Sequence, residues 1–385
     1  MTFVYAFIAM VWAAALSAAE MDIVFLAAEP EDIATLSNLD PIPENIGVAG
    51  FQLAISDNRT TGKFLDQTFR DHYIVIPLGG DPTPYFDEAL SLSPFVVTDL
   101  PMPLLLQLSD RPAAQGALIF NASAQDAALR TDQCKSNLFH TIPSYSMRSD
   151  ALAQVLLTKK WDKVALIFGS YDADIQFADA LRRSFAKFGL KLRSEKQWDA
   201  TADIRRTAAS EIPIFTQDLK DHDVLIIADE VDDFGRYVPF NTWLARPVAG
   251  SQGLRPIGWD RTAEQWGAAQ LQSRFAKDFD RHMYSRDYAA WAAVRSLGEA
   301  MTRTGLSDPK VIRDYILSDD FELAAFKGRA LSYRSWNGQL RQPIPVVGTT
   351  AVVANAPLDG FLHQRNELDT LGLDQGESAC TAFER

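Results

Sequence analysis

The segment Lys163-Val164-Ala165-Leu166-Ile167-Phe168-Gly169-Ser170-Tyr171-Asp172-Ala173-Asp174 decides the fold. Its first six residues form a short apolar run, which is typical of a strand buried on both faces. The stretch Ile175–Phe188 that follows has helical periodicity. Five further runs of the same strand-like character occur along the chain: Asp22–Leu26, Tyr73–Ile76, Phe95–Val97, Ala117–Phe120 and Asp223–Ala228. Because helical patterns lie between these runs, the sequence predicts an α/β fold with doubly wound parallel sheets.

The strand–helix alternation occurs twice, which predicts two lobes. One set of strands ends at Phe120, and a second begins at Lys163 after a turn-rich passage, so we expect the chain to cross between lobes near Pro143. The length of 385 residues suits two or three domains, or one interleaved pair of lobes. The helical stretch Asp287–Ser318 should pack back on the first lobe. We therefore expect lobe 1 to comprise residues 20–142 plus about 281–325, and lobe 2 to comprise 143–280 plus about 326–385, including a C-terminal tail.

Composition limits the function. The chain has 37 basic and 50 acidic residues, a net charge of −13, which argues against nucleic-acid binding because phosphate contacts need a basic surface. The first 19 residues hold an uncharged apolar run that ends in Ser17-Ala18-Ala19. This pattern predicts a signal peptide cleaved before Glu20 and export to the periplasm, with a membrane anchor as the alternative.

Cys134 and Cys380 are the only two cysteines. In an exported chain, where thiols are oxidised, they favour a disulfide with one possible connectivity. Two free thiols or a metal-binding pair are the alternatives. A disulfide would hold the polar C-terminal tail against the rest of the protein.

No catalytic motif occurs in the sequence. The chain lacks a G-x-S-x-G nucleophile motif, a phosphate-binding loop, a dinucleotide-binding glycine motif and H-E-x-x-H, and its five histidines are scattered. We therefore expect a binding protein that has no catalytic residues and is not an enzyme.

Ligands of doubly wound sheets bind beyond the carboxyl ends of the strands, so the residues after each strand are candidates. After the strand that ends at Phe120, Asn121, Ser123 and Gln125 precede an expected helix whose free N–H groups would receive an anion. Ordinary N-capping is the alternative.

The second half of the chain offers acidic and aromatic candidates after its strands. They are Tyr171, Asp172, Asp174, Asp229, Glu230, Trp259 and Asp260. If they converge on one rim, they would bind a cation, an ammonium group or a hard metal ion such as calcium or a lanthanide, with Asp172, Asp229, Glu230 and Asp260 as ligands. Capping of the following helices explains each acid separately.

Three stretches, Gly50–Ala54, Asn121–Ala124 and Lys160–Ile167, carry a family resemblance. The chain resembles the periplasmic substrate-binding proteins of ABC transporters, in the branched-chain amino-acid (type I) class. Four longer strings are similar to the subgroup associated with pyrroloquinoline-quinone (PQQ)-dependent alcohol dehydrogenase systems: Cys134–Ser144, Arg246–Gly250, Ser335–Pro343 and Leu368–Gly372.

The resemblance implies a type I periplasmic-binding-protein fold, in which two lobes joined by a hinge close on a solute. It also implies a small-molecule or metal-containing solute and, as partner, an ABC permease at the inner membrane. One departure concerns the ligand: the chain has Thr98-Asp99-Leu100-Pro101-Met102-Pro103 where amino-acid binders have a Ser-rich turn. Two prolines remove N–H donors and Asp99 would repel a carboxylate, so a free amino acid is not expected.

A second hypothesis belongs to another functional class. The chain would keep the fold but act as a periplasmic accessory or sensor protein that binds a protein partner, with a degenerate cleft. A deep pocket with converging polar side chains would favour solute binding, whereas a filled cleft would favour the partner role.

Overall fold

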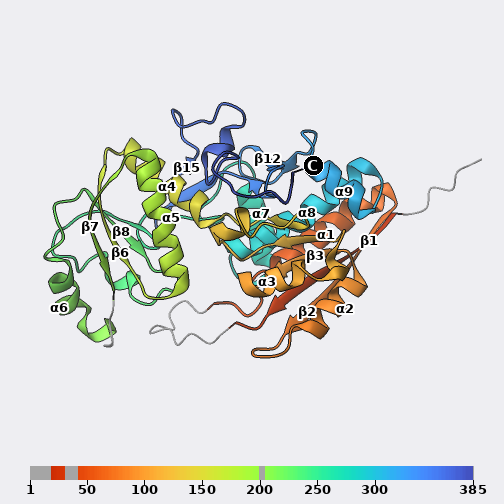
Figure 1. Cartoon of the computed structure of the whole chain (residues 1–385), viewed down its shortest axis with the longest axis horizontal. Helices are drawn as coiled ribbons and strands as arrows, with labels where there is room; N and C mark the ends of the chain where they lie inside the picture. Colours follow the sequence, from red (N-terminus) through yellow and green to blue (C-terminus); the bar gives the residue numbers. More distant parts are fainter. Residues whose placement is uncertain (1–18, 31–41, 199–203, 385) are drawn as a thin grey trace, which may run out of the picture.

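A computed structural model describes residues 19–30, 42–198 and 204–384, which form two α/β lobes lying side by side (Figure 1). The first lobe has a five-stranded parallel sheet in the order β2-β1-β3-β4-β5. Its strands are β1 (Ala19–Ala28), β2 (Gln67–Ile76), β3 (Phe95–Asp99), β4 (Leu118–Asn121) and β5 (Leu138–His140). Its helices are α1 (Val48–Leu65), α2 (Thr83–Leu92), α3 (Met102–Ser109), α7 (Ala268–Phe279), α8 (Ser285–Thr304) and α9 (Pro309–Ile316).

The second lobe has a separate four-stranded parallel sheet in the order β7-β6-β8-β9. Its strands are β6 (Lys163–Phe168), β7 (Lys191–Gln197), β8 (Val224–Ala228) and β9 (Val248–Gly250). Its helices are α4 (Tyr145–Thr158), α5 (Asp172–Phe188) and α6 (Ile204–Thr216). Two separate sheets confirm the predicted pair of doubly wound lobes.

Short antiparallel strands follow the parallel sheets. One group, β10 (Arg255–Pro256), β14 (Ile344–Val347) and β15 (Val352–Ala356), forms a three-stranded sheet beside the second lobe. The other group is β11 (Leu323–Ala324), β12 (Ala330–Tyr333) and β13 (Leu340–Arg341). In Figure 1 these C-terminal segments lie above the junction of the lobes.

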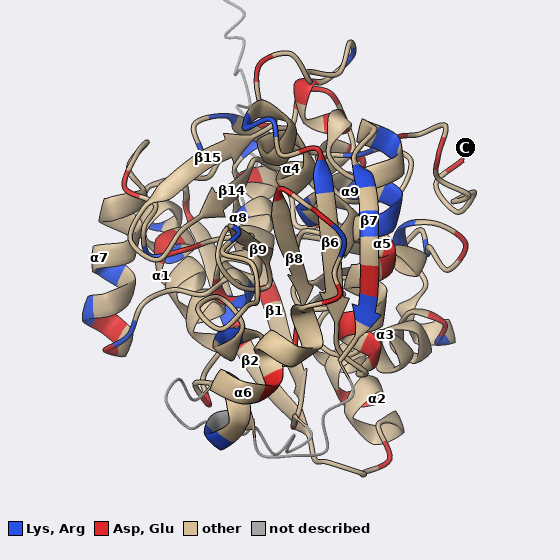
Figure 2. Cartoon of the chain, turned by 90° about the vertical axis from the view of Figure 1, so that its left-hand side faces the viewer, with Lys and Arg blue, Asp and Glu red and all other residues tan. Residues whose placement is uncertain are grey.

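Two strands, β2 and β7, have exposed side chains and so are not buried on both faces. β2 is an edge strand, and its Tyr73 and Val75 side chains are exposed, so only alternate residues are buried. β7 was not predicted, because four of the seven residues in its sequence KLRSEKQ are charged, as the blue and red segments of β7 in Figure 2 show. Like β2, β7 is an edge strand, and it lies in the second sheet, where its charged side chains remain hydrated.

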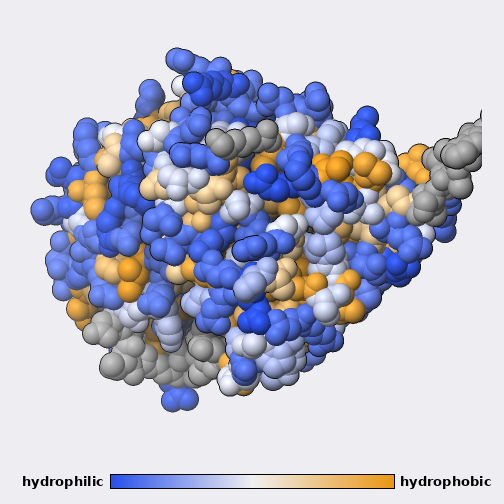
Figure 3. Space-filling model, turned by 45° about the vertical axis from the view of Figure 1, so that its right-hand side comes forward, coloured by the Kyte–Doolittle hydropathy of each residue, from blue (hydrophilic) through white to orange (hydrophobic). Residues whose placement is uncertain are grey.

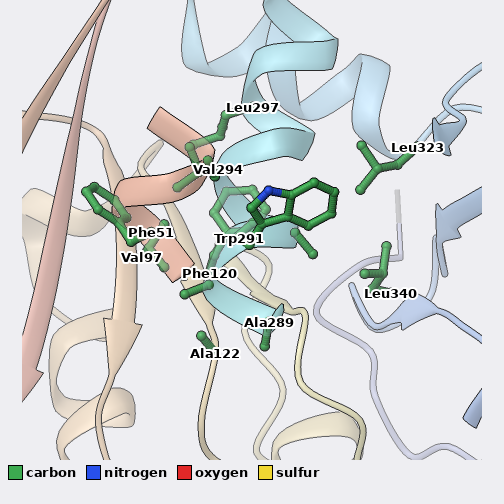
Figure 4. Close-up of a cluster of buried hydrophobic side chains, with 14 of the residues drawn as sticks. Phe51, Val97, Phe120, Ala122, Ala289, Trp291, Val294, Leu297, Leu323 and Leu340 are labelled. Carbon is green, nitrogen blue, oxygen red and sulfur yellow. The ribbon is translucent and has the colours of Figure 1, made fainter. Parts of the chain in front are cut away.

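The first lobe has a core assembled from distant parts of the chain. Trp291 on α8 is fully buried among side chains of α1, β4 and the C-terminal strands, including Phe120, Leu323 and Leu340 (Figure 4). As predicted, α8 and α9 pack back on this lobe. The second-lobe core comes from residues 145–249, with additions from β14, β15 and Leu371.

The expected lobe boundaries need two corrections. Helix α7, assigned by sequence to lobe 2, buries Leu271 and Phe275 in the first-lobe core. The strands β11 to β13 also pack there, through Leu331 and Leu340, although residues beyond 326 were expected in lobe 2. The reason is that the chain returns to the first lobe before Trp259, well upstream of the expected boundary at about 281.

The chain passes between the two cores near residues 142–145, 249–259, 340–344 and 371–380. Lys327 joins two of these passages, because its Nζ lies 2.6 Å from Gly258 O and 2.5 Å from Gln342 Oε1. Gln342 Nε2 in turn donates to Thr141 O at 2.7 Å, in the first passage. One buried lysine and one buried glutamine thus connect three hinge segments.

Cys134 and Cys380 form a disulfide, as predicted, and it holds the C-terminal segment on the first lobe. The expected signal peptide, residues 1–19, lies outside the described residues except for Ala19, the first residue of β1. None of the described helices has the length and apolar character needed to cross a membrane. The face seen in Figure 3 is mostly hydrophilic, with apolar side chains scattered over it.

Candidate functional site

The carboxyl edges of the two sheets are joined by one hydrogen-bonded chain of side chains. Arg148, in the first turns of α4, donates from Nη1 to Gln125 Oε1 at 2.9 Å, and Gln125 follows β4 of the first lobe. The same guanidinium donates from Nη2 to Glu230 Oε1 at 3.0 Å, and Glu230 follows β8 of the second lobe. The predicted residues Gln125 and Glu230 therefore come together through Arg148.

Arg148 is buried and held from several sides. Its Nε donates to Pro256 O at 2.8 Å, and its guanidinium lies 4.7 Å from the centre of the Phe177 ring. Glu230 also accepts from Ser251 Oγ at 2.8 Å. Because both charges are buried and fully partnered, the pair leaves no excess charge at the edge.

Asp174 is hydrogen-bonded to the backbone of Glu230, a member of this pair. Its carboxyl accepts the backbone N–H of Glu230 at 2.6 Å and that of Tyr171 at 3.3 Å, which caps the start of α5. Burial, with the nearby charge of Asp229, raises the pKa of the Asp174 carboxyl to about 7. Gly169 leaves the necessary space, since a side chain there would overlap the Asp174 carboxyl.

Asp229 is buried inside the loop that follows β8. Its carboxylate accepts the backbone N–H groups of Asp233, Phe234 and Gly235 at 2.9, 3.1 and 2.6 Å. Burial raises the pKa of Asp229 despite these three donors. The side chain therefore organises its own loop, as the capping alternative expected.

Tyr171 and Asp172 begin α5 and are exposed. Near them, a hollow of about 550 Å³ separates the lobes. Its first-lobe wall comes from α3 and the segment 126–128, and its second-lobe wall from the start of α4 and the middle of α5. The lining residues are Met102, Asp126, Ala127, Ala128, Tyr145, Gln176, Asp179, Arg182 and Arg183. Two acids and two arginines balance the charge of this hollow.

The structure corrects the expected helix after β4. Instead of a helix, residues 122–126 form a turn that leads to a 3₁₀ segment at Ala127–Arg130. Asn121 Oδ1 accepts the N–H groups of Ser123 and Ala124 at 3.1 and 2.8 Å. These N–H groups are thus already partnered by Asn121, and Ser123 Oγ donates to Leu100 O.

Trp259 and Asp260 do not lie with the other candidate residues at the ends of β4, β6 and β8. Trp259 is stacked on Tyr288 within the first-lobe core, with ring centres 4.5 Å apart. Asp260 accepts from the backbone and hydroxyl of Thr262 at 2.9 and 2.7 Å. The remaining candidates, by contrast, follow β4, β6 or β8.

Comparison with solved structures places this geometry in a known fold. A periplasmic binding protein from Burkholderia mallei has a TM-score of 0.66 and 12% identity over 95% of this chain and 100% of that chain. A branched-chain amino-acid ABC transporter periplasmic ligand-binding protein from Burkholderia xenovorans LB400 has a TM-score of 0.69 and 15% identity, covering 94% of this chain and 100% of that chain.

A solute-binding protein of an ABC transporter from R. palustris, in complex with benzoate, has a TM-score of 0.65 and 10% identity, covering 94% of this chain and 99% of that chain. The chain has the type I periplasmic-binding-protein fold. No model of a known protein family matches the sequence, and no curated protein matches it.

In this periplasmic-binding-protein fold, the metal hypothesis finds no supporting geometry. Among the residues that the structure describes, no three His, Cys, Asp or Glu side chains come together as a metal site. The Asp229 carboxylate accepts backbone N–H groups of its own loop, and Glu230 is paired with Arg148. Asp260 lies away from both. Of the four expected carboxylate ligands, Asp229, Glu230 and Asp260 thus have partners within the protein, whereas Asp172 is exposed at the start of α5.

Asp99, which was expected to repel a carboxylate, has a cationic partner in the structure. Asp99 at the end of β3 is paired with Arg286 at the start of α8. The pairing offsets the negative charge that would repel a carboxylate, whereas Pro101 and Pro103 still lack N–H donors. Charge alone therefore no longer argues against a zwitterionic solute.

Sequence reasoning missed Arg148 and Arg286. Arg148 lies in the first turns of α4 and Arg286 in the first turn of α8. The signal was indirect: Glu230 and Asp99, if buried at strand ends, each require a cation, and these arginines are distant in sequence but adjacent in the fold.

Proposed function

We propose that this chain is the periplasmic solute-binding component of an ABC importer, and that its lobes close on a small uncharged or zwitterionic polar solute. The observation that carries this proposal is a charge-balanced hollow between the lobes, beside the hydrogen bonds that join the two carboxyl edges. Doubly wound folds bind ligands at such edges. The likeness to periplasmic ligand-binding proteins supports it.

The subgroup resemblance adds a finer proposal. The strings that include Cys134–Ser144 and Ser335–Pro343 support a link to a PQQ-dependent alcohol dehydrogenase system. The solute would then be a small alcohol or an oxidation product of one. Its delivery would require an ABC permease at the inner membrane, and the protein itself would reside in the periplasm after loss of residues 1–19.

A thermal-shift screen of the mature chain tests the main proposal. The panel contains small alcohols and polyols, free amino acids, calcium and lanthanum, since a ligand that binds only the folded state raises the melting temperature. We expect an alcohol, polyol or amino acid to stabilise the protein and to reduce its radius of gyration in small-angle X-ray scattering.

Gln176→Ala is the matching site variant, because Gln176 lies on α5 and lines the hollow. Gln270→Ala is its control, since Gln270 is an exposed glutamine on α7 outside the hollow. The proposal requires that the first variant weaken solute binding and that the second leave it unchanged. Stabilisation by calcium or lanthanum alone would instead revive the hard-ion hypothesis.

A further inference from the structure

A second hollow lies at the hinge, away from the interlobe hollow. It has a volume of about 350 Å³, near the lower end of the range of small-molecule pockets, about 300–1,000 Å³. One wall consists of residues 259–266 and Phe326, which belong with the first lobe. The other wall consists of Pro345 and residues 350–355 of β14, β15 and their connection. An occupant would therefore contact both lobes.

The walls of this hinge hollow are aromatic. Trp259, Trp266 and Phe326 all line it. Trp259 is only 3% exposed, and its Nε1 has no hydrogen-bond partner among the residues that the structure describes. Trp266, in contrast, is 54% exposed, which is a large apolar area for a side chain at the edge of a cavity.

The backbone at two of these aromatic residues is strained. Trp266 has φ of 54° and Phe326 has φ of 59°, both in the left-handed region that bulky side chains rarely adopt. The other non-glycine residues with positive φ in the described part of the chain are Asp66, Lys160, Asp232 and Asp280. The two bulky aromatic cases thus line the same hollow, and such strained residues concentrate at ligand-binding positions.

Lys327 also lines the hinge hollow, but its donors are already used. Its Nζ lies within 3.1 Å of Gly258 O, Gln342 Oε1 and Pro343 O, and 4.6 Å above the Tyr288 ring. Glu264, exposed at the rim, would repel an anion. An uncharged occupant consequently fits better than a carboxylate.

We propose that the hinge hollow is a second binding site, separate from the interlobe hollow, for a small uncharged molecule with a planar aromatic ring. The ring packs against Trp266 and Phe326 and bridges first-lobe segments to β15. Because the hollow adjoins the hinge contacts of Lys327, its occupation changes the equilibrium between open and closed lobes. This inference does not depend on the proposed solute.

Isothermal titration calorimetry of the mature chain with acetophenone and with benzoate tests the chemistry. The two probes have the same ring, and only benzoate is charged. We expect acetophenone to bind and benzoate to bind at least tenfold more weakly. Equal or tighter binding of benzoate would overturn the uncharged assignment, and no binding of either probe would overturn the site.

Trp266→Ala locates the site. Removing the stacking surface should weaken acetophenone binding about tenfold. Trp243→Ala is the control, because Trp243 is 61% exposed and does not line the hollow. Exposed positions of this kind tolerate substitution, and circular dichroism would establish that both variants are folded. Equal binding by both variants would place the probe elsewhere.

Gln176→Ala separates the two hollows, because it alters only the interlobe hollow. Acetophenone should bind this variant as it binds the wild type. If Gln176→Ala instead abolished binding and Trp266→Ala did not, the probe would occupy the interlobe hollow, and the hinge site would be rejected while the proposed function remained intact.

Discussion

The two lobes differ in the partners of some of their buried acids. In the first lobe, Asp287 is bonded to Arg281 at 2.7 and 2.9 Å, and Asp99 is paired with Arg286. In the second lobe, Glu230 and Asp150 are likewise paired with Arg148 and Lys187, but Asp174 and Asp229 are held by backbone N–H groups at the carboxyl edge. Among the described residues, the four carboxyl groups whose pKa is raised by burial, those of Asp150, Asp174, Asp229 and Asp233, all lie in the second lobe.

The lobes also differ in how their cores are assembled. The first-lobe core draws on residues from 21 to 383 and is joined to the C-terminal segment by the disulfide. Most of the second-lobe core lies within residues 145–249. Together these differences indicate a first lobe that is fixed by long-range contacts and a second lobe that is assembled locally and holds carboxyl groups of raised pKa.

The largest effect that we predict tests the independence of the two cores. Trp291→Ala should lower the free energy of unfolding of the first lobe by about 3–5 kcal/mol, because it leaves a large cavity. Hydrogen exchange should accelerate in β3, β4 and α1 but remain slow in β6 and β8. Equal loss of protection in both sheets would contradict separate cores, and Trp243→Ala, at an exposed position, should change neither.

The next effect concerns the covalent link of the first lobe. The double variant Cys134→Ala, Cys380→Ala should lose about 2–4 kcal/mol of stability, since the disulfide spans 246 residues and constrains the unfolded chain. Urea unfolding measures this loss. Reducing the wild-type protein should reproduce it, and a reductant that destabilised the double variant equally would show that another process is responsible.

Much of the second lobe could be predicted from sequence because its signals are local. β6 was predicted at its observed bounds, and α5 was placed within three residues, since an apolar run followed by helical periodicity is sufficient. β7 was missed because four of its seven residues are charged, which an edge strand tolerates but which gives no apolar run to recognise. In the first lobe, α7 was assigned to the wrong core because its partners lie about 220 residues earlier, in α1.

The candidate site was predicted only in part, for a physical reason. Residues after strands were expected at the carboxyl edges because of parallel topology, and the candidates after β4, β6 and β8 follow those strands, whereas Trp259 and Asp260 do not. Their partners were not visible, because nothing near Glu230 in sequence indicates Arg148, 82 residues earlier. Without that partner the acids suggest a cation site, whereas in the fold Glu230 is paired with Arg148 and Asp229 accepts three backbone N–H groups. Lys327 at the hinge was missed for the same reason.

A smaller effect distinguishes the lobes by pH. Asp174 has a pKa of about 7 in the folded protein, above its unfolded value, so the folded state binds the extra proton. Its contribution to stability is therefore complete at low pH and decreases by about 2 kcal/mol as pH rises from 5 to 7. Asp174→Asn should remove this decrease, so the cost of the substitution should shrink as pH rises.

The matched control for this prediction lies in the first lobe. A hydrogen bond from Thr131 lowers the pKa of Asp132, so this carboxylate stays ionised throughout the interval from pH 5 to 7. The stability change caused by Asp132→Asn should be constant over that range. Urea denaturation at several pH values measures both variants, and parallel pH profiles for Asp174→Asn and the wild type would reject the assigned pKa.

The smallest predicted change in stability tests the contact between the lobes. Gln125→Ala removes the acceptor that the first lobe offers to Arg148, and we expect it to cost about 1 kcal/mol. Arg148 keeps Glu230 and Pro256 as partners, so it should remain ordered within the second lobe. What should change is the distance between the lobes.

Small-angle X-ray scattering would detect this change as a larger radius of gyration in Gln125→Ala than in the wild type. Gln133→Ala is the control, because Gln133 is an exposed glutamine whose amide reaches only the adjacent Asp132. If the lobes separate in the first variant alone, the hydrogen bond between the carboxyl edges limits opening. An unchanged radius in both variants would mean that the hinge segments around Lys327 determine the separation, and that the edge contact only follows it.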